Sequence, residues 1–420
     1  MIGSEEALRH ILAVCRPLAT EMVPLALTLD RVLAHDVVAT DDLPPFDNSA
    51  MDGFALATHG VELQVGREFV VSGLQAAGDA MTDASQACEI MTGACLPTGL
   101  DAVVPVEQVS VLARDVDGRP QRIRLCATVG HRAHVRGRGE DVARDQLVLS
   151  AGQRVTPASR MLLAAIGVAE TSMRPQVPAA LLNTGRELVD EPRQPLASGQ
   201  IRNCNGPYLT DRLREAGCCV VHQQTVGDDA QAFAAALDCG LAAGARVILS
   251  TGAVSMGRYD FVPDALHALG AEIVFHKIAM RPGKPLLFAI LPGGELYFGL
   301  PGNPASAAVG MRFFVEPAVR ALLGLPCERP LRLPLVEGVK KKPGFRFLLK
   351  ARVEFNPQSD LQVRVLTGQE SFRIRPMLDA NAWVSLDDGA EQLSAGTMVD
   401  VYGLDARGVR LSAMEVASGN

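Results

Sequence analysis

Three segments rich in glycine and hydroxyl side chains could bind a phosphate group: Asn183–Glu187, Ser250–Gly257 and Gly299–Pro304. Glycine lets the backbone approach a phosphate closely, and hydroxyl and free backbone N–H groups can donate to its oxygens. None matches the GxGxxG or P-loop pattern, so an ordinary strand-to-helix turn explains any one of them alone. Their recurrence favours an anion site, with Ser250, Gly252, Ser255, Pro301, Asn303 and Pro304 as candidate binding residues.

A fourth segment, Lys277–Pro285, places the cations Lys277, Arg281 and Lys284 in one short loop. Opposite charges 4 Å apart attract by about 4 kcal/mol at an effective dielectric of 20. The formal net charge of -7 is spread over the chain, and charges beyond about 8 Å are screened. The loop can therefore bind an oxyanion. A solvated basic loop is the alternative, but Pro282 and Pro285 stiffen the segment and favour the site.

Several carboxylates lie next to turns. Asp52 lies in the turn-rich segment Asp47–Gly53, Asp141 closes the segment Arg138–Asp141, and Asp228 and Asp260 follow predicted strand ends. Carboxylate oxygens are hard ligands suited to a Mg²⁺ ion that bridges phosphates. Taken singly, an aspartate at a turn is more often structural than catalytic.

The elements that position these segments alternate between strand and helix from Val177 onward. Apolar runs such as Ala179–Leu182 and Arg246–Leu249 predict buried strands, and helices are predicted over 205–216, 229–243, 261–269 and 304–323. This alternation predicts a doubly wound α/β domain with a largely parallel sheet. Ligands bind such sheets at the carboxyl ends of the strands, where the candidate segments fall.

The rest of the chain divides by pattern into domains. Short apolar runs separated by glycine predict an inserted β-rich domain over 46–140, and a helix is predicted over 157–166. The alternating strands after Pro326 predict a C-terminal β-barrel over 326–420. Residues 1–45 and 141–175 then form a split N-terminal domain, and residues 176–325 form the α/β domain.

Composition excludes several classes of function. The chain has 420 residues, one Trp, four Tyr and, as its longest basic run, Lys340–Lys342, so a nucleic-acid binder is not expected. No apolar run reaches about 18 residues without a charge or breaker, so no membrane span is expected. The nine cysteines contain no CxxC pair, which favours a reducing, cytoplasmic location.

Longer blocks carry a family resemblance. Pro44–Ala55 resembles the signature of the molybdopterin molybdenumtransferases, the MoeA family that includes the gephyrin E domain. Ile90–Ala94, Arg136–Asp141, Phe275–Pro285 and Gly299–Pro304 match further family blocks in order. The chain departs from the family pattern at Arg186, Ala253, Arg281 and Arg375-Pro376.

The resemblance implies a four-domain homodimer that inserts molybdate into adenylylated molybdopterin with Mg²⁺-dependent release of AMP. It also implies that the α/β domain, residues 176–325, is the molybdopterin-binding domain and is similar to molybdopterin adenylyltransferase, and that the split N-terminal domain, residues 1–45 and 141–175, is the dimerisation domain. Molybdopterin adenylyltransferase and cofactor-accepting molybdoenzymes are the implied partners. The family's active site lies between this domain and the β-rich domain of the other subunit.

The resemblance also implies residue roles. Arg281, Lys284 and Ser306 would form an oxyanion site that Arg346 and Ser371 complete, and Lys277 would hold a phosphate on the pterin side. Catalytic and Mg²⁺-binding roles fall to Glu187, Asp228 and Asp260. Four further catalytic residues would reach across from the partner subunit: Asp52, Thr92, Arg136 and Asp141.

Two other functions remain open at this point. A molybdopterin adenylyltransferase would suit the α/β domain, but residues 1–175 are unexpected there, because the adenylyltransferases that the α/β domain resembles have a single domain. A pterin-binding scaffold without turnover is permitted by the gephyrin resemblance. It would bind adenylylated molybdopterin without releasing AMP.

Overall fold

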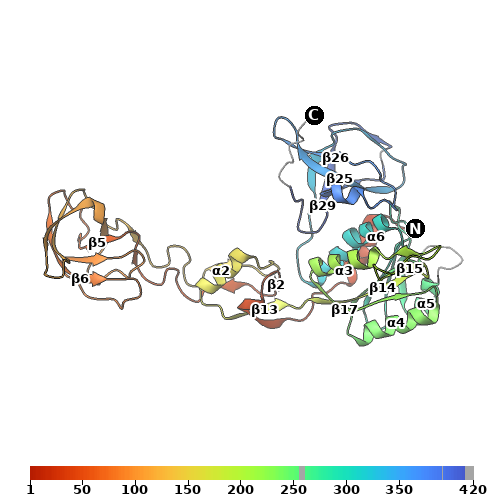
Figure 1. Ribbon diagram of the computed structural model, residues 1–420, viewed down its shortest axis with the longest axis horizontal. Helices are drawn as coiled ribbons and strands as arrows, with labels where there is room; N and C mark the ends of the chain where they lie inside the picture. The colour runs from red at the N-terminus through yellow and green to blue at the C-terminus, as the bar shows by residue number, and fades with distance from the viewer. Residues whose placement is uncertain (255–260, 390, 412–420) are drawn as a thin grey trace. The chain divides into compact units, whose positions relative to one another are not determined.

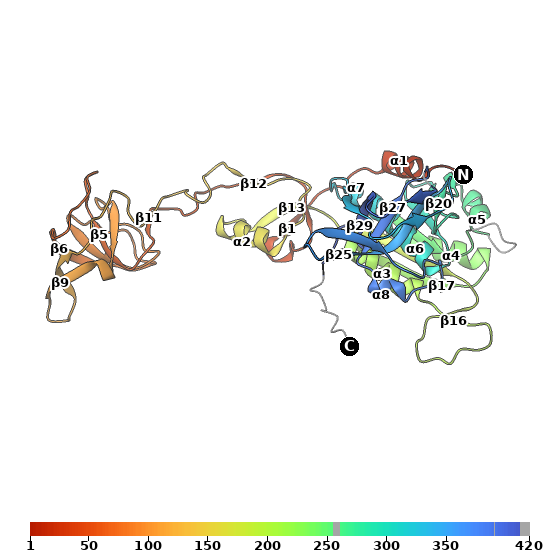
Figure 2. The same ribbon diagram turned by 90° about the horizontal axis from the view of Figure 1, so that it is seen from above.

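The computed structural model describes residues 1–254, 261–389 and 391–411, and the chain forms two compact units (Figures 1 and 2). The first comprises Met1–Glu21, Asp30–Ala34 and Met173–Asn420, and the second comprises Met22–Leu29 and His35–Ser172. Three short strands lie at or near the boundary residues: β1 (Glu21–Pro24), β2 (Val32–Leu33) and β13 (Glu170–Arg174). In the described ranges no helix has the length and apolar character to span a bilayer.

The second unit contains the predicted β-rich domain as a six-stranded sheet of order β8-β5-β7-β6-β10-β9. The first residue of β5, Gly53, has to be glycine, because a Cβ there would lie 1.9 Å from the carbonyl oxygen of Val104 on the neighbouring strand. The sheet's elements are β5 (Gly53–Leu56), β6 (Glu68–Gln75), β7 (Ala87–Ile90), β8 (Ala102–Pro105), η2 (Val106–Gln108), β9 (Val109–Arg114) and β10 (Pro120–Leu125).

The same unit has a small second core around α2 (Pro157–Ala165), the helix predicted over 157–166. Thr156 and Ser159 form a reciprocal capping box that fixes where α2 begins. Leu163 and Ile166 of this region pack against Ala39 and Val142. Short paired strands complete the unit: β3 (Val37–Val38) with β12 (Leu147–Leu149), and β4 (Asn48–Ser49) with β11 (Val135–Arg136), together with η1 (Leu25–Leu27).

The first unit is built on a six-stranded sheet of order β17-β14-β18-β22-β21-β19. Four strands are parallel: β14 (Val177–Thr184), β17 (Cys218–Val226), β18 (Val247–Thr251) and β22 (Leu296–Leu300). At one edge β21 (Leu287–Ile290) pairs antiparallel with β22, and β19 (Glu272–His276) pairs antiparallel with β21. The predicted doubly wound, largely parallel α/β domain is confirmed.

Helices cover both faces of this sheet (Figure 1). One face packs on α1 (Ser4–Val14), α3 (Asn205–Ala216), α6 (Pro304–Gly310) and α7 (Glu316–Leu322). The other packs on α4 (Ala230–Ala242) and α5 (Val262–Ala268). The long helix predicted over 304–323 is present, but a π-helical turn, η3 (Met311–Val315), separates α6 from α7. Two short strands, β15 (Leu188–Val189) and β16 (Ile201–Arg202), pair beside the sheet.

The C-terminal strands form the predicted β-barrel, in which β23-β29-β27-β25-β26 are successive neighbours. A bridge between Leu335 and Val363 joins the residue after β23 to β26, so the sheet closes on itself. The elements are β23 (Leu331–Pro334), β24 (Val339–Lys340), β25 (Arg346–Phe355), β26 (Leu361–Val365), α8 (Pro376–Asp379), β27 (Ala382–Leu386), β28 (Gln392–Leu393) and β29 (Met398–Gly403). The sequence pattern did not predict the short helix α8.

Candidate active site

The carboxyl ends of four parallel strands meet at one edge of the α/β sheet. Asn183 of β14 is in register with Thr251 of β18, and Thr251 is in register with Leu300 of β22. Thr184 is in register with Val226, the last residue of β17. The loops that follow these strands therefore begin side by side, as expected for a doubly wound sheet.

A cavity of about 520 Å³ lies at this edge, and we refer to it as the strand-end cavity. Its volume falls within the range of roughly 300–1,000 Å³ that is usual for small-molecule sites. Five residues proposed from the sequence line it: Glu187, Asp228, Gly252, Pro301 and Asn303. The other lining residues are Thr184, Gly185, Leu188, Ile201, Asn205, Thr251, Ala253, Val254, Pro285 and Gly302.

Two carboxylates face this cavity from different strand ends. Glu187 folds back over Gly185, where a Cβ would lie 2.7 Å from its Oε1 atom. Asp228, which follows β17, is exposed. Mg²⁺ is usually held by one or two carboxylates together with phosphates of the substrate, so this pair fits it. Within the described ranges no group of three or more His, Cys, Asp or Glu residues could hold a metal ion.

The backbone at Thr184 and Gly252 also lines the cavity, and the two residues approach each other closely. Gly252 has a φ of +88°, and a Cβ there would lie 2.6 Å from the carbonyl oxygen of Thr184. The hydroxyl of Thr184 donates to the Thr251 carbonyl at 2.9 Å. Both the left-handed conformation and the close approach therefore require glycine at 252.

Asn205 was not proposed from the sequence, yet it lines the cavity from the first position of α3. Its Nδ2 atom donates to the Gly302 carbonyl at 2.7 Å. Asn205 thus ties the start of α3 to the loop after β22. An amide at the start of a helix beside three candidate loops is the signal that could have identified it.

The structure places other proposed residues outside the cavity lining. Ser250 is fully buried, and its hydroxyl accepts a hydrogen bond from Tyr297, because alternation along β18 turns Thr251 rather than Ser250 toward the site. Ser306 is also buried, within α6. Pro304 begins α6 beside the cavity residue Asn303. Ser255 and Asp260 lie outside the described residues.

The cationic loop was expected to be irregular, but part of it forms a strand, β20 (Met280–Arg281). β20 pairs with β25 so that Met280 is in register with Arg346 and Arg281 with Phe347. Arg281 is exposed and its guanidinium lies 5.1 Å from the centre of the Phe345 ring. The pairing therefore brings Arg281 and Arg346 onto neighbouring strands.

The two lysines of this loop lie on either side of β20. Lys277 is half-buried with a φ of +81°, and its carbonyl accepts from the amide of Ile2 at 3.3 Å. Lys284 is exposed and precedes Pro285, which lines the strand-end cavity. The loop thus extends from the N-terminal residues to the cavity edge.

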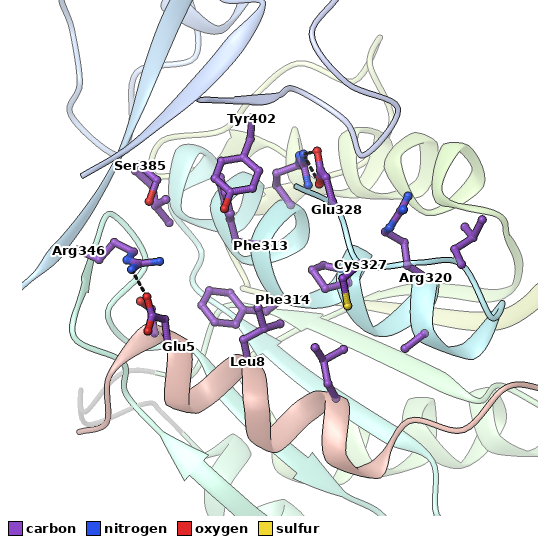
Figure 3. A pocket seen from close by; sticks show the side chains of 17 residues that line it. Glu5, Leu8, Phe313, Phe314, Arg320, Cys327, Glu328, Arg346, Ser385 and Tyr402 are labelled. Carbon is purple, nitrogen blue, oxygen red and sulfur yellow. Dashed lines mark hydrogen bonds and ion pairs between the residues drawn. The ribbon is translucent and has the colours of Figure 1, made fainter. Parts of the chain in front are cut away.

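Arg346 is held by two carboxylates. Its Nη2 atom donates to Glu5 at 2.5 Å and to Asp387 at 2.9 Å. Figure 3 shows the Glu5 pair at one end of a second, smaller cavity of about 150 Å³. An oxyanion that binds Arg346 would have to compete with both carboxylates.

Ser371 contacts the α/β domain through its backbone. Its carbonyl accepts from the amide of Ala305, in the first turn of α6, at 2.9 Å. The buried Lys350 supports this loop by donating to the carbonyls of Gly368 at 2.7 Å and Arg373 at 3.2 Å. Burial lowers the pKa of Lys350 below its usual value.

We expect Lys350→Met to lower the free energy of unfolding by about 1–3 kcal/mol, because carbonyls that are left unpaired in a buried site are costly. Urea denaturation measures the change. Lys342→Met, at an exposed position of the same domain, is the matched control and should change stability by less than about 0.5 kcal/mol. An equal effect of both substitutions would contradict the supporting role.

In the second unit, Asp52 and Thr92 form a contact. The Thr92 amide donates to Asp52 Oδ1 at 2.7 Å and the Thr92 hydroxyl donates to the same oxygen at 3.0 Å. The amide contact, with the hydroxyl contact, holds the pKa of Asp52 below its usual range. Asp52 is therefore ionised at neutral pH.

The other two proposed residues of this unit lie on separate segments. Arg136 is exposed on β11, in register with Asn48 of β4. β4 also pairs with the loop of Thr92, since the Gly93 amide donates to the Ser49 carbonyl at 2.8 Å. Asp141 is exposed, and its amide donates to the Leu43 carbonyl at 3.0 Å. The structure thus gathers Asp52, Thr92 and Arg136 around β4.

Comparisons with known proteins agree with this organisation. Three family models match in order: the MoeA N-terminal region (domain I and II) over residues 2–167, a probable molybdopterin binding domain over 180–321, and the MoeA C-terminal region (domain IV) over 332–404. Two crystal structures of molybdopterin biosynthesis MoeA proteins from Pyrococcus horikoshii superpose with a TM-score of 0.78, at 26% and 23% identity, each covering 96% of this chain and 99% of its own.

Curated relatives cover nearly the whole chain. The molybdopterin molybdenumtransferase of Synechococcus elongatus is 40% identical over 396 residues, which is 92% of this chain and 95% of that protein. Molybdopterin molybdenumtransferase 2 of Mycobacterium tuberculosis is 36% identical over 95% of this chain and 98% of its own length. These matches define a multidomain protein whose α/β domain corresponds to the model of a probable molybdopterin binding domain. The chain belongs to the MoeA family, and the predicted resemblance is confirmed.

Proposed function

We propose that this chain is a molybdopterin molybdenumtransferase, which inserts molybdate into adenylylated molybdopterin with Mg²⁺-dependent release of AMP. The observation that carries the proposal is the strand-end cavity, which is lined by Glu187, Asp228 and residues of glycine-rich loops. The family models match the chain along most of its length, which supports the same function. Both carboxylates and the anion-binding loops suit a substrate that contains a phosphoanhydride bond.

Glu187 and Asp228 would hold Mg²⁺, with Asp260 as a further proposed ligand. Bound there, the ion would neutralise phosphate charge during cleavage of the anhydride. In this proposal Thr251, Gly252 and Asn303 contact the substrate from the loops that line the cavity. Asn205 holds the start of α3 against the loop after β22 by donating a hydrogen bond to the Gly302 carbonyl. Arg281, Lys284 and Arg346, with Ser306 and Ser371, would bind molybdate, and Lys277 a phosphate on the pterin side.

The proposed active enzyme is a homodimer. Asp52, Thr92, Arg136 and Asp141 of one subunit would complete the strand-end cavity of the other. The ionised state of Asp52 suits a residue that accepts a hydrogen bond from a donor group of the substrate.

A cytoplasmic location and pathway partners belong to the same proposal. All nine cysteines are free thiols, which suits a reducing compartment. A molybdopterin adenylyltransferase would supply the substrate, and molybdoenzymes would accept the product.

The test is AMP release from adenylylated molybdopterin with Mg²⁺, with and without micromolar molybdate. The transferase is expected to release AMP faster when molybdate is present. Tight binding of the substrate without AMP release would instead favour a pterin-binding scaffold, and transfer of AMP from ATP to molybdopterin would favour an adenylyltransferase.

The Arg346 ion pairs lead to a prediction about molybdate. Glu5→Gln is expected to lower the KM for molybdate by up to about fivefold, because an exposed ion pair contributes about 0–1 kcal/mol and its loss frees the guanidinium. Glu6→Gln, which removes the neighbouring carboxylate 4.0 Å from His10, is the matched control. A KM that rises in Glu5→Gln would show that Glu5 orients Arg346 instead of competing with molybdate.

A further inference from the structure

The cationic loop, Lys277–Pro285, lies between Ile2 and strand β25. The Ala279 amide donates to the Ile2 carbonyl at 2.8 Å, and the Ala279 carbonyl accepts from the Arg346 amide at 3.0 Å. A parallel β-bridge also pairs Ile2 with Ile278. The backbone of Ile2 therefore continues the hydrogen bonding between the loop and β25 on the other side of the loop.

One residue of this loop has an unfavourable backbone conformation. Lys277 has a φ of +81°, in the left-handed region that residues with a side chain seldom adopt. Its amide donates to the Leu286 carbonyl at 2.9 Å, and its carbonyl accepts from the Ile2 amide at 3.3 Å. Such a conformation persists only where the surrounding structure enforces it. The hydrogen bond from Ile2 is thus one of the contacts that hold Lys277 in place.

The loop is anchored in the core at alternate residues. Ile278 and Met280 are fully buried, whereas Arg281 is exposed. The Ile278 amide donates to the Lys284 carbonyl at 2.9 Å, which closes the loop, and Ile2 packs against the core cluster that contains Ile278. A shift of Ile278 would therefore displace the backbone of both Arg281 and Lys284.

The side chains of the loop oppose its order. Lys277, Arg281 and Lys284 lie within eight residues of sequence, and their like charges repel one another until an anion binds. An anion that had to order the loop would bind less tightly, because the ordering cost is subtracted from the binding free energy. Backbone hydrogen bonds that order the loop in advance remove part of this cost.

We propose that Ile2 is a positioning residue of the molybdate site: its backbone amide and carbonyl order the cationic loop so that Arg281 and Lys284 are in place before the oxyanion binds. This inference rests on the proposed function, which assigns these two side chains to molybdate. Because Ile2 acts through the loop, its loss should change the affinity for molybdate and leave the chemical step unchanged.

The experiment measures molybdate binding to the full chain by isothermal titration calorimetry in Ile2→Pro, which removes the amide that donates to Lys277. This variant is expected to bind molybdate about tenfold more weakly than wild type, because one hydrogen bond and the order that it imposes are lost. Ser4→Pro is the matched control. Ser4 is the first residue of α1, where proline is tolerated because the amide has no partner within the helix. Its molybdate affinity should stay within about twofold of wild type.

The assay for AMP release gives a second measurement, which separates positioning from a general loss of structure. In Ile2→Pro the KM for molybdate should rise about tenfold, while kcat at saturating molybdate stays within about twofold of wild type. Ile2→Ala keeps both backbone hydrogen bonds and should raise this KM less than Ile2→Pro does. Glu5→Gln, three residues further along the chain, is expected to lower the KM, because Glu5 pairs with Arg346 (Figure 3).

The outcomes distinguish this inference from the proposed function. Unchanged molybdate binding in Ile2→Pro would overturn the inference, and so would an equal loss in Ser4→Pro or an absence of molybdate binding in wild type. If wild type releases AMP with molybdate but Ile2→Pro binds molybdate normally, the positioning role is wrong and the transferase stands. If wild type binds molybdate without releasing AMP, and Ile2→Pro weakens that binding, the positioning role stands and the transferase is wrong.

Discussion

Asp228→Asn is expected to lower molybdate-stimulated AMP release at least about 100-fold, because loss of even an outer-shell partner of a bound metal costs about 10–100-fold. Asp228 and Glu187 both line the strand-end cavity, and they are the carboxylates that the described cavity lining supplies. Asparagine preserves the shape of the side chain and removes its charge. The steady-state rate as a function of Mg²⁺ concentration measures the effect, and the apparent Mg²⁺ affinity should fall with it.

The neighbouring aspartate provides the control. Asp229 accepts a hydrogen bond from the Ala232 amide at 2.7 Å and caps α4, but it does not line the cavity. Asp229→Asn retains an acceptor for this cap and should keep close to the wild-type rate. If both substitutions reduced the rate equally, the charge of Asp228 would not be the cause, and the Mg²⁺ site would have to lie elsewhere.

Glu187 and Asp228 could be placed at one sheet edge from the sequence because parallel strands put their carboxyl ends together. Which residue of a strand end faces the site could not be read in the same way. Ser250 and Thr251 are both hydroxyl residues, and only the register of β18 against β14 and β22 decides that Thr251 lines the cavity while Ser250 meets Tyr297.

Long-range pairing accounts for the other features that the sequence did not predict. The loop of Arg281 becomes a strand only because β25, far away in the chain, supplies its partner. The ion pair between Glu5 and Arg346 joins residues that are 341 positions apart in the chain. Local periodicity carries no information on such contacts, and it also missed the single turn of α8, which is too short to show a helical repeat.

The second large effect concerns the proposed dimer. Asp52→Ala alone and Asp228→Asn alone should each be nearly inactive, but a mixture with exchanged subunits is expected to recover roughly a quarter of the wild-type rate. Random exchange places about half of the subunits in mixed dimers, and each mixed dimer would contain one intact site if a site combines the second unit of one subunit with the strand-end cavity of the other. The AMP-release rate before and after subunit exchange measures the recovery.

The control mixture combines Glu187→Gln with Asp228→Asn. Both residues line the same cavity of one subunit, so every site in that mixture carries a defect and no recovery is possible. Light scattering of tagged subunits verifies that the subunits have exchanged. If the mixture of the Asp52→Ala and Asp228→Asn variants then recovers no activity, each active site lies within one subunit. Recovery would tie the Asp52–Thr92 pair to chemistry on the partner, because Asp52 contributes a carboxylate that two Thr92 donors keep ionised.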